Sequence, residues 1–87
     1  MIIKLKMPHP KDDQWVLENV AHIVGNGTFE RDTQDPDRWN IDLMNNNWWA
    51  RIEDGVLMVS GRYANDDTMQ AVKQMLLFRC HNEVREL

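Results

Sequence analysis

The chain of 87 residues is long enough for one small folded domain, and its composition is that of a globular protein. Its hydrophobic fraction of 43% and charged fraction of 28% exclude a chain that is disordered throughout. Ten lysines and arginines oppose fourteen aspartates and glutamates, which gives a net charge of −4 without a long block of either sign. The sequence shows neither the basic stripe of a nucleic-acid-binding protein nor the roughly 18 apolar residues of a membrane span. We therefore expect a single domain over residues 1–87 that contacts neither nucleic acid nor membrane directly.

The N-terminal segment and the cysteine content indicate a cytoplasmic protein. The apolar run in MIIKLKMPHP is too short for a signal peptide, and no small-residue cleavage site follows it. Cys80 is the single cysteine, so an internal disulfide cannot form, which fits a reducing compartment. We expect a cytoplasmic location, which is the host cytoplasm if a phage encodes the protein.

The first two elements predicted along the chain are a strand and a helix. Residues 2–7 alternate apolar side chains with lysine, as in a half-buried strand. Residues 10–24 have apolar positions at helical spacing, and Asp12 and Asp13 complement the positive end of the helix dipole. Gly25-Asn26-Gly27 is predicted to end this helix with a left-handed residue.

The middle of the chain is predicted to be a β-meander. A short strand over 28–31 precedes a polar loop over 32–37, because proline and its aspartate neighbours favour turns. Three runs then alternate apolar and polar residues, at 39–43, 48–53 and 56–61. We expect these runs to form three antiparallel strands with one shared apolar face.

The predicted register follows from the turns. Asp54-Gly55 is a strong two-residue hairpin signal, and such a turn places Trp48 opposite Gly61. A four-residue loop over 44–47 would place Leu43 opposite Trp48. Both pairings put the same apolar set on one face, as expected for a consistent fold.

The last element predicted is a second helix that runs to about Arg79. Asp67 and Gln70 have the spacing of a capping box. The apolar stripe of this helix consists of Met69, Val72, Met75, Leu76 and Cys80. Leu77 and Phe78 widen the stripe, so we expect this helix to be more buried than the first.

These elements predict an α+β fold in the order β-α-(β)-β-β-β-α. The meander and an additional N-terminal strand form one layer, and both helices form the other, on the sheet face that carries Trp48. The sequence leaves open where the first strand pairs and whether residues 81–87 are ordered.

Adjacent tryptophans in a strand point to opposite faces, so Trp49 is predicted to lie on the outer side of the sheet. Left in water, its side chain would forgo a few kcal/mol, at about 25 cal/mol per Å² of apolar surface. One interpretation is that Trp49 lies flat on Arg51 or Met58, and another is that the first helix crosses to this face. The functional interpretation is a docking patch for another protein. Its predicted members are Trp49, Arg51, Glu53, Val56, Met58 and Arg62.

The function expected from these features is protein binding by a small acidic protein. By analogy of size and composition alone, such proteins are used by phages and mobile elements to block host nucleic-acid-processing or defence complexes, as anti-CRISPR inhibitors do. Exposed carboxylates would then occupy a basic groove on the partner. The predicted acidic surface consists of Glu30, Asp32, Asp35, Asp37 and Asp42.

No motif in the sequence indicates a reaction, a metal or a cofactor. A zinc site needs three or four ligands at characteristic spacing, and the available histidines and cysteine lack it. The side chains considered for this site are His9, His22, Cys80 and His81. We therefore expect no metal, no cofactor and no enzymatic activity.

Two other functions remain open from the sequence. The first is a self-associating structural or regulatory subunit, a homodimer formed through the outer sheet face or an edge strand. The second is a small ligand-binding or enzymatic domain that uses a space between sheet and helices. The polar side chains available to such a site are His22, Arg79, Cys80 and His81.

Overall fold

The computed structural model describes residues 1–7, 12–80 and 83–87, apart from the side chains of Arg79 and Cys80. The elements are β1 (Ile2–Lys6), α1 (Asp13–Val24), β2 (Phe29–Arg31), β3 (Arg38–Ile41), β4 (Trp48–Glu53), β5 (Val56–Gly61), α2 (Asp66–Cys80) and β6 (Arg85–Glu86). The α+β fold predicted from the sequence is confirmed, with one short strand added at the C-terminus.

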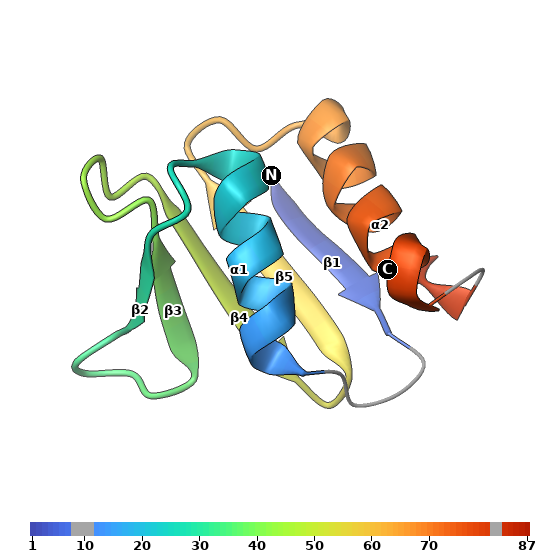
Figure 1. Ribbon diagram of the computed structural model, residues 1–87, viewed down its shortest axis with the longest axis horizontal. Coiled ribbons are helices and arrows are strands. Elements are labelled where there is room, and N and C mark those ends of the chain that lie inside the picture. The colour runs from blue at the N-terminus through green and yellow to red at the C-terminus, as the bar shows by residue number, and fades with distance from the viewer. Residues whose placement is uncertain (8–11, 81–82) are drawn as a thin grey trace.

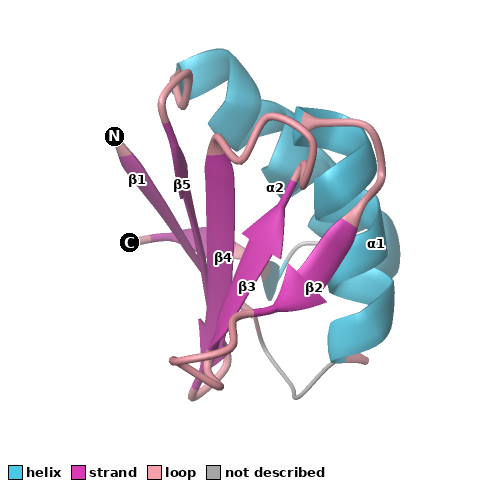
Figure 2. Cartoon of the chain, turned by 90° about the vertical axis from the view of Figure 1, so that its left-hand side faces the viewer, coloured by secondary structure: helices cyan, strands magenta, loops and turns pink. Residues whose placement is uncertain are grey.

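The strands form one antiparallel sheet in the order β2-β3-β4-β5-β1-β6. Both helices lie on the same face of this sheet, α1 in front of the middle strands and α2 beside β1 (Figure 1). The view turned by 90° shows the sheet as one layer and the helices as the second (Figure 2). We call the sheet face opposite the helices the outer face.

The N-terminal strand β1 pairs with β5, so the two ends of the chain meet at one side of the sheet. Its register places Leu5 opposite Leu57, and β6 pairs with the other edge of β1. The Leu87 amide adds a hydrogen bond to the Lys4 carbonyl at 3.0 Å. This pairing answers the question of strand position that the sequence left open.

The core lies between the sheet and the helices and is built from side chains of both layers. Its fully buried members include Ile3, Leu5, Val16, Leu17, Val20, Ile41, Ala50, Leu57, Val59, Val72 and Leu76. Trp48 is 7% exposed and packs where Gly61 has no side chain, as the predicted pairing requires. A Cβ at Gly61 would lie 2.5 Å from the Trp48 ring, so the close approach of these two residues depends on glycine.

Helix α1 begins where its N-cap, Asp12, accepts the Gln14 amide at 3.0 Å. The predicted start at residue 10 lies outside the described residues. The predicted left-handed stop is correct for Gly27, with φ 87°, whereas Gly25 has extended backbone. Both glycine amides donate to the Ala21 carbonyl, so the chain turns over three residues.

The predicted four-residue loop over 44–47, between β3 and β4, is wrong. Ile41, and not Leu43, pairs with Trp48, and residues 42–47 form the connection. Asp42 has a left-handed φ of 59°, and its carbonyl accepts the amides of Asn45 and Asn46. These bonds end β3 two residues early. A slip of two residues keeps the side chains of β3 on their predicted faces.

Two predictions for α2 are also wrong. The cap is Asn65, whose Oδ1 accepts the Thr68 amide at 2.9 Å, so the helix begins before Asp67. Val72 is buried in its middle, but Phe78 is 86% exposed. The helix lies beside β1 at one side of the sheet, so only one narrow stripe of it is covered and it is less buried than α1 (Figure 1).

Candidate protein-binding surface

Five of the six residues predicted for the docking patch lie together on the outer face. Trp49, Arg51 and Glu53 alternate with buried residues along β4. In the neighbouring strand Met58 lies opposite Arg51, and Val56 lies opposite Glu53. Both helices lie on the other face of the sheet (Figure 2), and Trp49 lies between the buried Trp48 and Ala50 in β4, so its predicted outward direction is correct. The structure thus brings these side chains into one continuous surface.

Arg62 is the predicted member that lies apart from the others. It follows the end of β5, and its amide donates to the Asn47 carbonyl at 3.2 Å. Its guanidinium lies over the ring of Tyr63, 5.7 Å from the centroid. Because Tyr63 is 61% exposed, this pair forms a rim feature at one end of the sheet.

Trp49 is half-buried, and its partner is a residue that the sequence analysis did not consider. The guanidinium of Arg38 lies 5.5 Å from the indole centroid. Arg38 comes from β3, where it sits opposite Arg51 in the register. A cation in this position on an exposed indole contributes about 0.5–1 kcal/mol. Part of the Trp49 ring is therefore covered by the protein itself, and the remainder faces solvent.

Arg51 is held at the centre of the outer face by two carboxylates. Its Nη1 donates to Glu53 Oε1 at 2.9 Å, and its Nη2 pairs with Asp35. All three side chains are partly exposed, so these ion pairs add little to stability. Their effect is to hold the loop after β2 against the outer face.

The predicted acidic surface has a mainly structural role in the structure. Asp32 accepts the amides of Gln34 and Asp35 and the side-chain amide of Asn40. The hydrogen bond from Asn40, followed by that from the Gln34 backbone, lowers the pKa of Asp32 below its ordinary value of 3.8. Asp35 is paired with Arg51, as described above. Glu30 and Asp37 are exposed.

Asp42 does not belong to the surface, so this part of the prediction is wrong. The residue is 6% exposed, and its Cβ lies where a side chain on Gly25 would be. Its Oδ2 accepts the Asn45 side-chain amide at 3.0 Å, but its Oδ1 is buried and has no hydrogen-bond partner in the described part of the chain. The left-handed turn at this residue directs the carboxylate inward, which alternation along a strand could not predict.

Sequence reasoning missed the concentration of cations on the outer face. Lys4 and Lys6 point outward from β1 because the residues between and beside them are buried. Arg85 lies opposite Lys6 in β6, and Lys6 also donates to the Asp54 carbonyl at 2.9 Å. The outer-face cations are Lys4, Lys6, Arg38, Arg51 and Arg85. The alternating lysines were visible in the sequence, but their place beside β5 was not.

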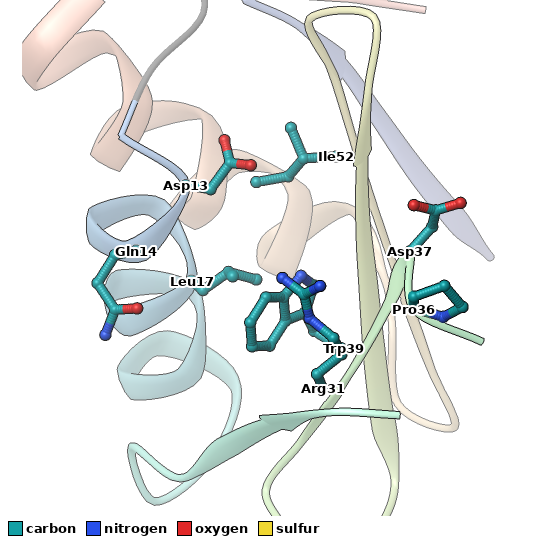
Figure 3. A pocket seen from close by; sticks show the side chains of 8 residues that line it. All are labelled: Asp13, Gln14, Leu17, Arg31, Pro36, Asp37, Trp39 and Ile52. Carbon is teal, nitrogen blue, oxygen red and sulfur yellow. The ribbon is translucent and has the colours of Figure 1, made fainter. Parts of the chain in front are cut away.

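A pocket of about 290 Å³ opens on the other side of the sheet, between the first turn of α1 and strands β2 to β4 (Figure 3). Its lining residues are Asp13, Gln14, Leu17, Arg31, Pro36, Asp37, Trp39 and Ile52. His22, one of the residues considered for such a site, is exposed elsewhere on α1. The side chains of Arg79 and Cys80, and the whole of His81 and His9, lie outside the described residues.

Within residues 1–7, 12–80 and 83–87, no three acidic, histidine or cysteine side chains are grouped as metal ligands would be. Over the same residues, neither helix has the length and apolar character required to cross a bilayer. The chain matches no protein-family model, no curated protein and no solved structure. The functional interpretation therefore rests on the contacts and charges of this chain.

Proposed function

We propose that the protein binds another protein through its outer face and acts by occluding an acidic surface of that partner. The observation that carries the proposal is one uncovered sheet face with an apolar centre and a surplus of cations. We call the apolar side chains of this face the apolar centre, and they are Ile2, Trp49, Val56 and Met58.

The apolar centre has the composition of a protein-binding core. Trp49, Val56 and Met58 come from adjacent strands and are each partly exposed, and Ile2 is 53% exposed. Protein interfaces combine an apolar core with a polar rim and are enriched in tryptophan, methionine and arginine. Arginine and tryptophan are also frequent among the residues that dominate binding energy. The contact between Arg38 and Trp49 places an arginine and a tryptophan side by side on this face.

The charges of the outer face indicate an acidic partner. Five cations lie on it, whereas its four anions are Glu30, Glu53, Asp35, which is paired with Arg51, and Asp32, which accepts a hydrogen bond from Asn40. The sign of this face is therefore opposite to the net charge of −4 of the whole chain. Opposite potentials steer two proteins together and disfavour partners of the same sign.

Two features favour a protein partner over a nucleic acid. Single-stranded nucleic acids bind to sheets that present free aromatic rings, and Trp49 already stacks with Arg38. Glu30 and Glu53 also lie on this face and would repel phosphates. A methionine and two aliphatic side chains complete the centre, which suits a protein surface better than a row of bases.

A second copy of the chain is a poorer occupant of this face. In a symmetric dimer the same patch meets itself, so the five cations would approach one another.

Inhibition of a host complex by a phage or mobile-element protein, as with an anti-CRISPR, remains the biological setting that we propose. It rests on the small size and acidic composition of the chain.

The test compares two variants as baits in affinity capture from the native host, followed by binding measurements with each purified candidate. Trp49→Ala combined with Met58→Ala should weaken binding by at least ~10-fold, or about 1.4 kcal/mol. The control, Phe78→Ala, removes an exposed aromatic side chain from α2 and should leave the affinity unchanged.

Three results would contradict the proposal. Equal affinity of the double variant and the wild type would exclude the outer face. Tight binding of a single-stranded oligonucleotide that is lost on Lys4→Glu would replace the protein partner by a nucleic acid. Sedimentation as a dimer that the double variant abolishes would replace it by a second copy.

A further inference from the structure

The pocket beside α1 lies away from the outer face, and it contains three charged side chains that have no charged partner among the described residues. The carboxylates of Asp13 and Asp37 make no ion pair or side-chain hydrogen bond with the described residues. Arg31 has no carboxylate partner there either, although both carboxylates line the same pocket. The pocket therefore presents one positive and two negative charges to solvent.

Arg31 is held in place by an aromatic ring. Its guanidinium lies 4.8 Å from the centroid of Trp39, whose own orientation is set by an edge contact with Phe29 at 5.9 Å. In Figure 3 the guanidinium lies over the indole. A stacked guanidinium keeps its N–H groups directed away from the ring edge. It is prepared to bind a planar carboxylate with two hydrogen bonds.

The remaining walls are apolar or neutral. Ile52 is partly buried and offers an apolar floor beside Trp39, and the fully buried Leu17 lies behind it. Gln14 points away from the cavity in Figure 3, and its Nε2 donates to Glu18 Oε1 at 3.0 Å. Most of the accessible surface of the pocket is polar, so the charged groups determine which ligand it can bind.

Size and charge together select a class of ligand. The pocket has a volume of about 290 Å³, which is roughly ten times the ~30 Å³ that one water molecule occupies in the liquid. A basic amino acid has about ten non-hydrogen atoms, so the pocket can hold a molecule of this size. Such a molecule carries one carboxylate and two cationic groups, which is the reverse of the charges of the pocket. Its methylene groups match the apolar floor.

We propose that this pocket binds a free basic amino acid. The ligand carboxylate pairs with Arg31, and its two cationic groups meet Asp13 and Asp37. Its aliphatic chain lies on Ile52. This site goes beyond the proposed protein-binding function, and the two lie on opposite faces of the sheet, so that either can fail without the other.

The test is a titration of the full chain with L-lysine at constant ionic strength, followed by NMR at the Trp39 indole N–H. We expect a saturable shift there and at the amides of Asp13 and Gln14. L-lysinamide lacks the carboxylate, norleucine lacks the side-chain cation, and Nα-acetyl-lysine lacks the α-ammonium. Each should bind roughly 2- to 5-fold more weakly, since one partly exposed ion pair contributes up to about 1 kcal/mol.

Matched variants assign each contact. Arg31→Gln should weaken lysine binding and remove the preference for lysine over lysinamide, because both changes delete the same pair. Asp13→Asn and Asp37→Asn should each weaken lysine binding without removing that preference. Asp66→Asn is the control, because it changes a first-turn aspartate of α2 instead of α1, and it should leave binding unchanged.

Several results would overturn the inference. Absence of a saturable shift with lysine at tens of millimolar would exclude the site. Equal binding of lysine and lysinamide, or an unchanged affinity in Arg31→Gln, would exclude the carboxylate contact. Because the three substituted side chains lie at the surface, a native spectrum of each variant separates lost binding from lost folding.

Discussion

Two adjacent tryptophans have opposite environments because they occupy successive positions of one strand. Trp48 is 7% exposed and fills the space beside Gly61, whereas Trp49 is on the outer face under Arg38. The alternation of strand residues predicts this difference from sequence. The identity of the covering cation was not predictable, since Arg38 comes from another strand.

Asp42 is the residue whose environment is least favourable. Its Oδ1 is buried without a partner in the described chain, and the side chain contacts Gly25 at the C-terminal end of α1. A negative charge at that end opposes the helix dipole, and an unsatisfied buried acceptor costs about 1–3 kcal/mol.

We expect Asp42→Asn to increase the free energy of unfolding by about 0.3–1 kcal/mol, because it removes a negative charge from the C-terminal end of α1. Asparagine accepts the left-handed φ of 59°, keeps an oxygen for the Asn45 side chain and removes the charge. Urea unfolding followed by tryptophan fluorescence measures the change. Asp42→Ala should destabilise instead, because alanine fits this φ poorly and loses the hydrogen bond. A less stable Asp42→Asn would show that the charge is favourable in place.

The helices and turns differ in how well their sequences predict them. The Asp54-Gly55 hairpin has the predicted register at all its pairs, because a two-residue turn leaves little freedom. The connection over residues 42–47 differs, since Asp42 starts a turn with backbone bonds that no short motif indicates. For α2, three residues that are able to cap a helix follow one another from Asn65, and spacing alone selected the wrong one.

The N-cap of α2 can be tested by a matched pair of substitutions. Asn65→Ala should reduce the free energy of unfolding by about 1 kcal/mol, because it removes the acceptor for the Thr68 amide and hydroxyl. Asp67→Ala should change it by less than ~0.5 kcal/mol, since this residue lies inside the helix. Thermal and urea unfolding of both variants provide the comparison. A larger loss of stability in Asp67→Ala than in Asn65→Ala would show that Asp67 caps the helix, as the sequence suggested.

The whole molecule is electrically polarised, although its net charge suggests a uniformly acidic protein. Five cations gather on the outer face, while acidic residues mark the starts of both helices on the other side. Three of these cations, Lys4, Lys6 and Arg85, come from the two ends of the chain, which β1 and β6 bring to one side of the sheet. The polarity determines the sign of the partner that we propose.

Repulsion between the cations of the outer face should lower the free energy of unfolding slightly. The substitution Lys4→Glu tests this expectation. Lys4 and Lys6 both point outward from β1, and Arg85 of β6 lies opposite Lys6. Removing the repulsion should stabilise the protein by a few tenths of a kcal/mol at low salt, and the gain should vanish at about 1 M salt. The same variant should associate more slowly with an acidic partner. A loss of stability together with unchanged association would show that Lys4 serves the fold.

Alternation, helical spacing and turn dipeptides in the chain predicted the α+β class, the faces of the meander strands and the outward direction of Trp49. These features are determined by residues that lie within a few positions of one another, so a local sequence pattern is enough to predict them. The pairing of β1 with β5, the inward turn of Asp42, the cations of the outer face and the charged pocket could not be predicted in this way. Each joins residues far apart in the sequence, so each depended on how the sheet and helices pack together.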